Sequence, residues 1–136
     1  MNTEYAQEKI KRQVFKMAMM EIDSMYKGNV TTVHSAITAT ATSVIVDCTG
    51  YNALLVEFVI SGAANWTVSL TGSLTRGGTY GSLYELANTG SMAAMSYQLN
   101  SNRVFLFKGI PDWVKVVATE DAGAETVTVR VQPLNV

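Results

Sequence analysis

The order of hydrophobic and polar positions divides this chain into two parts. In residues 3–27, apolar side chains recur at helical spacing and predict one amphipathic helix. From residue 30 to residue 136, short apolar runs with period-two alternation are separated by Gly, Ser, Thr and Asn, which is typical of β-strands joined by turns. The pattern therefore predicts a helix followed by a β-domain.

The apolar stripe of the expected helix is broad, and it takes in Ile10, Val14, Met17, Ala18, Ile22 and Met25, with Phe15, Met19 and Tyr26 beside it. In the second half it covers about half of the circumference, more than the single face of a simple surface helix. Such a helix is usually buried on two sides, and its own β-domain and a neighbouring subunit are the two surfaces that could cover it. Its methionines suit either core filling or an adaptable interface. We take the candidate subunit interface to be Ile10, Val14, Phe15, Met17, Met19, Ile22 and Met25.

The β-region divides into about eight expected strands, enough for two packed sheets. They cover residues 43–49, 53–61, 66–71, 82–86, 96–99, 103–107, 113–119 and 125–131. The expected fold class is mainly β: an antiparallel sandwich, or a jelly-roll-like domain, preceded by one helix. We expect three segments: the helix in 1–28, an extended connector or edge strand in 29–42, and the sandwich domain in 43–136.

Period-two alternation also predicts which strand residues point inward. We expect three inward-facing sets, which are Leu54, Val56, Phe58 and Ile60; Val127, Val129 and Val131; and Val44, Val46 and Cys48. Trp66 and Trp113 begin strands and are expected to pack inside the sandwich. Glu57 lies within the strongest strand, where we expect it to face solvent or to pair with Arg130.

The composition points to subunit contacts. Charged residues make up 15% of the chain and hydrophobic residues 48%, against about 25% charged residues in ordinary globular proteins. Part of the surface is therefore expected to face another subunit. The net charge of −1 predicts no nucleic-acid partner, and no apolar run approaches the roughly 20 residues of a membrane span. The polar first residues do not resemble a signal peptide, and a single cysteine excludes an intrachain disulfide.

No set of residues predicts catalysis, a metal site or a cofactor. His34 and Cys48 are the only residues of their kinds. Nothing in the sequence orients His34 as a base for the thiol, which is expected to be buried and inert. Tyr80 and Tyr84, near a Gly-rich loop, are weak candidates for ligand-facing aromatics. They support an alternative function, a carbohydrate-binding module that attaches to a host surface.

Four segments in order carry a resemblance to a known family: Asp47-Cys-Thr-Gly-Tyr-Asn-Ala-Leu-Leu-Val-Glu-Phe, Trp66-Thr-Val-Ser-Leu-Thr-Gly-Ser, Phe107-Lys-Gly-Ile-Pro-Asp-Trp-Val-Lys-Val-Val-Ala-Thr and Thr126-Val-Thr-Val-Arg-Val. Together they resemble small β-sandwich modules of tailed-bacteriophage virion proteins over residues 43–132. The chain departs from that pattern in the loop after Ser73.

The resemblance implies a virion structural protein that is not an enzyme, such as a capsid decoration (cement) protein or a head-fibre, tail or baseplate component. It implies assembly in the host cytoplasm, with copies of the chain itself and other virion proteins as partners.

Overall fold

The computed structural model describes residues 3–61, 65–86, 90–122 and 125–136; the side chains of residues 14–25, 86 and 122 lie outside the description. One helix precedes a series of strands, several of them only two or three residues long. The elements are α1 Thr3–Tyr26, β1 Thr31–Ile37, β2 Ala41–Thr42, β3 Val46–Asp47, β4 Ala53–Ile60, β5 Asn65–Ser73, β6 Gly81–Ser82, β7 Tyr84–Leu86, β8 Met92–Ala94, β9 Ser96–Leu99, β10 Arg103–Lys108, β11 Trp113–Ala122 and β12 Val127–Leu134.

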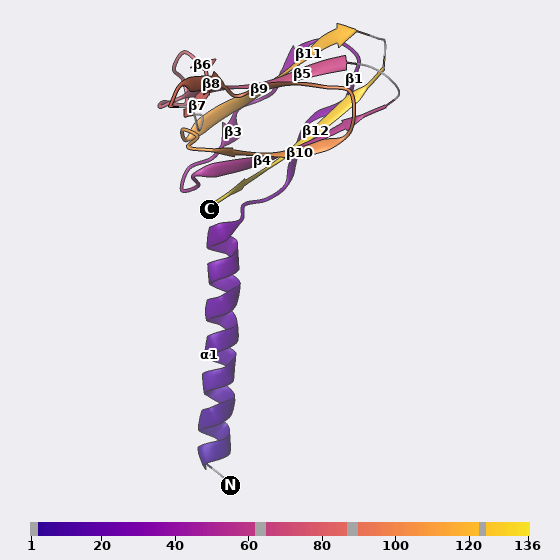
Figure 1. Ribbon diagram of the computed structural model, residues 1–136. Coiled ribbons are helices and arrows are strands. Elements are labelled where there is room, and N and C mark those ends of the chain that lie inside the picture. The colour runs from indigo at the N-terminus through magenta and orange to yellow at the C-terminus, as the bar shows by residue number, and fades with distance from the viewer. Residues whose placement is uncertain (1–2, 62–64, 87–89, 123–124) are drawn as a thin grey trace.

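The strands form two packed sheets and a small hairpin (Figure 1). The four-stranded sheet has the order β1-β12-β4-β10. The six-stranded sheet has the order β2-β11-β5-β6, with β3 paired to β11 and β9 paired to β5. β7 and β8 pair only with each other, and the strand pairs are antiparallel. The structure therefore confirms the mainly β fold class with one N-terminal helix.

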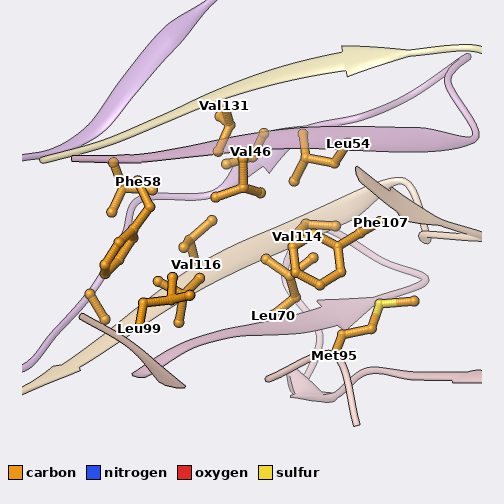
Figure 2. Close-up of a cluster of buried hydrophobic side chains, with 14 of the residues drawn as sticks. Val46, Leu54, Phe58, Leu70, Met95, Leu99, Phe107, Val114, Val116 and Val131 are labelled. Atoms are coloured by element: carbon orange, nitrogen blue, oxygen red, sulfur yellow. The ribbon is translucent and has the colours of Figure 1, made fainter. Parts of the chain in front are cut away.

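The core lies between the two sheets because alternate residues of the long strands are apolar. β4 buries Leu54, Val56 and Phe58, and β12 across from it buries its three valines. The facing strands β5 and β11 contribute Trp66, Val68, Leu70, Val114, Val116 and Ala118. Figure 2 shows these layers meeting around Phe58, Leu70 and Val116. The inward sets expected for residues 54–60 and 127–131 are confirmed.

A hydrogen bond from His34 on β1 to Val116 on β11 also joins the two sheets. The Val116 carbonyl accepts a hydrogen bond from the backbone N–H of Ser43 and another from Nε2 of the buried His34, both 2.9 Å long. Because a carbonyl has no proton to give, Nε2 carries the proton. The Ser43 hydroxyl accepts a hydrogen bond from the Val116 N–H at 2.9 Å. In the gap between β2 and β3, this side chain therefore takes the place of a backbone acceptor for β11.

This arrangement corrects the expected strand at residues 43–49. Only Val46 and Asp47 pair as a strand there. Because Ser43 bonds β11 through its side chain and the two-residue strands β2 and β3 leave a gap between them, the alternation breaks. As a result, Val44 is 73% exposed, whereas Val46 and Cys48 remain buried. The expected inward position of Val44 is wrong.

Two other expectations need correction. The strand predicted at 82–86 is two short strands, β6 and β7, and β8 forms opposite β7 in a stretch where no strand was expected. Trp66 is fully buried, but Trp113 is only half-buried. On β11 the residues at even numbers from Val114 face inward, so Trp113 belongs to the outer face, where the Arg76 guanidinium lies 5.6 Å from its ring centroid.

His34 offers a direct test of the link between the sheets. Replacing His34 with Ala removes one of two donors to the Val116 carbonyl, which keeps its hydrogen bond from Ser43. A hydrogen bond lost in this way contributes about 0.5–1.5 kcal/mol. Chemical denaturation should show a fall of that size in the free energy of unfolding. The exposed neighbour Ser35 provides the control, and Ser35→Ala should change little. Equal stabilities of the two variants would contradict the structural role of His34.

Candidate functional site

The helix α1 stands away from the sandwich (Figure 1). With 24 residues it is about 36 Å long at 1.5 Å per residue. Of its side chains in residues 3–13, only Ala6 is half-buried and the rest are exposed; Tyr26 at the other end is also exposed. In residues 3–13 and at Tyr26, where its side chains are described, the helix does not pack on either sheet.

A set of hydrogen bonds fixes the base of α1 to the end of β12. The N–H of Gly28 donates to the Pro133 carbonyl at 2.7 Å, and the N–H of Asn135 donates to the Tyr26 carbonyl at 2.8 Å. The Gln132 side chain donates to the carbonyl of Gly28 at 3.0 Å. A Cβ on Gly28 would lie 3.3 Å from Pro133 Cδ and from its carbonyl oxygen, so a larger residue would crowd this joint. The helix is therefore bonded directly to the sandwich.

The candidate interface residues are placed only in part. Ile10 is exposed on α1, where it is available to a partner. The other candidates lie on the same helix, but their side chains fall outside the described residues: Val14, Phe15, Met17, Met19, Ile22 and Met25. Their contacts as an interface stay a prediction.

A hollow of about 340 Å³ lies where the helix meets the sandwich, beside β1 and β3. Its lining includes Gly28, Val33, Val44, Tyr51 and the carboxylate of Asp47. The backbone N–H of Thr49 donates to Asp47 at 3.0 Å and, as the main cause, lowers the pKa of that carboxyl. This is the geometry of a local turn, in which the carboxylate satisfies the backbone.

The two tyrosines expected to face a ligand have different surroundings. Tyr80 is half-buried, its hydroxyl donates to the Arg76 carbonyl at 2.8 Å, and Lys115 Nζ lies 4.3 Å from its ring centroid. An ammonium over the ring leaves that face closed to a stacked sugar. Tyr84 is exposed on the β7–β8 hairpin opposite Ala94. The described contacts do not join the two rings into one platform.

An aromatic cluster on β9 and β10 was missed by the sequence reasoning. Tyr97 stacks on Phe105 with centroids 4.9 Å apart, and Phe107 lies next to both. The Tyr97 hydroxyl donates to Glu85 at 2.9 Å, which raises the pKa of the phenol. The alternation of Phe105 and Phe107 could have predicted that the two rings share one face of β10. Their contact with Tyr97 could not be predicted in this way, because β9 and β10 belong to different sheets.

The environments of Cys48 and His34 do not suit a nucleophile and its base. Cys48 has no exposed surface, and burial, followed by the nearby charges of Asp47 and Asp112, raises its pKa to about 12. The described His34 contact is with the Val116 carbonyl. A protonated, buried thiol is a poor nucleophile.

Within the described residues, no three metal-ligating side chains of the His, Cys, Asp and Glu types gather. In the same part of the chain, the helix lacks the apolar length needed to cross a bilayer.

The comparisons with known proteins concern the fold alone. No family model and no curated protein matches the sequence. Solved structures do match the fold, and two of them illustrate the likeness. The YomS protein derived from the SPBc2 prophage is 19% identical, with a TM-score of 0.59 over 79% of this chain and 92% of YomS. The PBSX exported protein XepA is 15% identical, with a TM-score of 0.59 over 79% of this chain and 38% of XepA. The chain thus spans well under half of XepA.

The resemblance to β-sandwich modules of phage proteins is therefore confirmed at the level of the fold. Identities below 20% do not transfer a position in a particle or a binding partner.

The buried thiol can be tested with a disulfide reagent. Because the pKa of Cys48 is about 12, roughly one Cys48 side chain in ten thousand is a thiolate at pH 8. The residue also has no exposed surface. We expect native protein to react with 5,5′-dithiobis(2-nitrobenzoate) only at the rate of its opening, and denaturant-unfolded protein to react at once. Fast stoichiometric reaction of the native chain would show that Cys48 is accessible.

Proposed function

We propose that this chain is a structural protein of a tailed-phage particle that acts through subunit contacts and has no catalytic role. The roles that fit are a capsid decoration protein, a head-fibre protein or a tail component. The observation that carries the proposal is a 24-residue helix that is bonded to a phage-type β-sandwich at its base and stands clear of both sheets.

Physical chemistry explains why the helix needs a partner. Helices in proteins owe most of their stability to the packing of an apolar face against other parts of the structure, and less to the propensities of their residues. The described exposed ion pair Glu8–Arg12, at 3.8 Å, contributes at most about 0.5 kcal/mol. A stripe that includes Ile10 and Ile22 therefore has to be covered in the working assembly, by another copy or by another virion protein.

Particle composition tests the proposed role directly. Mass spectrometry of purified particles from the source phage should detect the chain at a fixed copy number. A copy number that rises in proportion to the number of capsid subunits would indicate a decoration protein. A few copies per particle would indicate a fibre or tail component. Repeated absence from intact particles would refute the virion role.

A charge on the apolar stripe tests the helix as the attachment device. Ile22→Asp would bury an unpaired carboxylate in the contact, which costs several kcal/mol, and should release the chain from its assembly. Because α1 stands apart from the sheets, the melting temperature of the sandwich should stay nearly unchanged. Lys9→Asp, on the opposite, exposed side of the helix, serves as the control and should still assemble. Normal incorporation of Ile22→Asp would mean that the helix is not the attachment device.

The division into helix and sandwich generates a further expectation. A chain that begins at Asn29 keeps both sheets and the core but loses the three hydrogen bonds that join Tyr26 and Gly28 to the end of β12. It should therefore melt cooperatively, at a somewhat lower temperature, and fail to enter particles. A broad, non-cooperative melt followed by circular dichroism would show that the helix is part of the folding unit.

A further inference from the structure

The outward face of the four-stranded sheet is apolar at both margins. Val30, beside β1, is 61% exposed and Val104, on β10, is 62% exposed; Leu106 is exposed as well. Between these margins runs a hollow of about 250 Å³, lined by Val30, Leu55, Glu57, Val104, Arg130, Val131 and Gln132. Exposed apolar residues on both margins of one sheet face are typical of a contact with another protein.

The centre of this face carries one ion pair. Arg130 Nη1 lies 2.8 Å from Glu57 Oε1, with the two side chains 43% and 46% exposed. The contact uses one guanidinium nitrogen and one carboxylate oxygen. Because guanidinium has five N–H donors and carboxylate has two oxygens, both groups keep capacity for a partner. The partner that fits this face best therefore carries an anion and a cation spaced like Arg130 and Glu57, with apolar residues on both sides of them.

The strand register shows that the chain itself meets this requirement. Thr32, Arg130, Glu57 and Val104 form one row across β1, β12, β4 and β10. We infer that a second copy of this chain covers the face, related by a twofold axis that runs parallel to the strands between β12 and β4. The axis places Arg130 of each copy over Glu57 of the other and β10 over β1, so that Val104 meets the Thr32 and Val30 margin.

The charges also disfavour one competing mode of self-association. β10 is an edge strand of its sheet, and a second β10 could in principle extend that sheet. Antiparallel pairing of two β10 strands in full register would place Arg103 opposite Lys108, which sets like charges side by side. Contact through the face avoids this repulsion, whereas contact through the edge does not.

The contact is distinct from the proposed role of α1. Since the axis runs along the strands, it brings the helix-bearing ends of both copies to the same end of the pair. There α1 leaves the sandwich on the side of this face (Figure 1), so each helix has to run past the end of the partner's sandwich. The isologous contact doubles the number of chains in whatever assembly the helix forms.

Mixing two charge-reversed variants of the full chain tests the geometry. In Glu57→Arg, cations meet cations across the axis, and in Arg130→Glu, anions meet anions. Each variant alone should show half of the wild-type mass by light scattering. In an equimolar mixture the introduced arginine of one copy faces the introduced glutamate of the other, and the wild-type mass should return. Repair inside one chain cannot produce this recovery, because the ion pair stays broken in both variants.

Thermal melts confirm that each variant is folded before its mass is compared. Val104→Asp, at the apolar margin, should also halve the mass, whereas Leu74→Asp, on a loop and 87% exposed, should not. Wild-type mass in the single variants, no recovery on mixing, or a monomeric wild type would each overturn the twofold contact. If only Ile22→Asp lowers the mass, the helix assembles the chain and this face does not, so the two proposals fail separately.

Discussion

The two-residue period of β4 is the constraint on which the rest of the structure depends. The strand lies between β12 and β10, and its inward residues, Leu54, Val56 and Phe58, occupy the middle of the core. Any shift of register by one residue would exchange Phe58 for Glu57 in that core. The same constraint sends Leu55 and Val59 outward, so burying the core leaves apolar side chains on the surface. A correctly folded chain therefore presents Leu55 and Val59 on the outward face of the four-stranded sheet.

The long strands could be predicted from the sequence because their signal is local. Alternation along the chain placed β4 and β12 together with their inward faces, it placed β5 as a strand, and a broad stripe placed α1. The failures have a common physical cause, which is pairing over long sequence separations. Val44 is exposed because Ser43 bonds β11, and β8 exists because it meets β7; neither partner can be identified from neighbouring residues.

The candidate site was less predictable than the fold. The helical stripe indicated that α1 is buried against something, but periodicity does not identify the covering surface. The hydrogen bonds from Gly28 to Pro133 and from Asn135 to Tyr26 hold the base of the helix at the end of β12. Sequence reasoning expected Glu57 to face solvent or to pair with Arg130, and the pair is present. What it did not show was that the pair lies between the exposed apolar residues Val30 and Val104.

The placement of that ion pair has its own physical logic. A half-exposed pair contributes about 0–1 kcal/mol to the stability of a single chain, so two apolar residues in its place would cost the sandwich little. They would, however, join the margins into one continuous apolar band across the sheet, which binds many surfaces without preference. A cation and an anion in fixed order penalise every partner that leaves either charge unpaired once water is excluded. In the twofold contact inferred above, the apolar margins would supply affinity, and Glu57 with Arg130 would select the partner and its orientation.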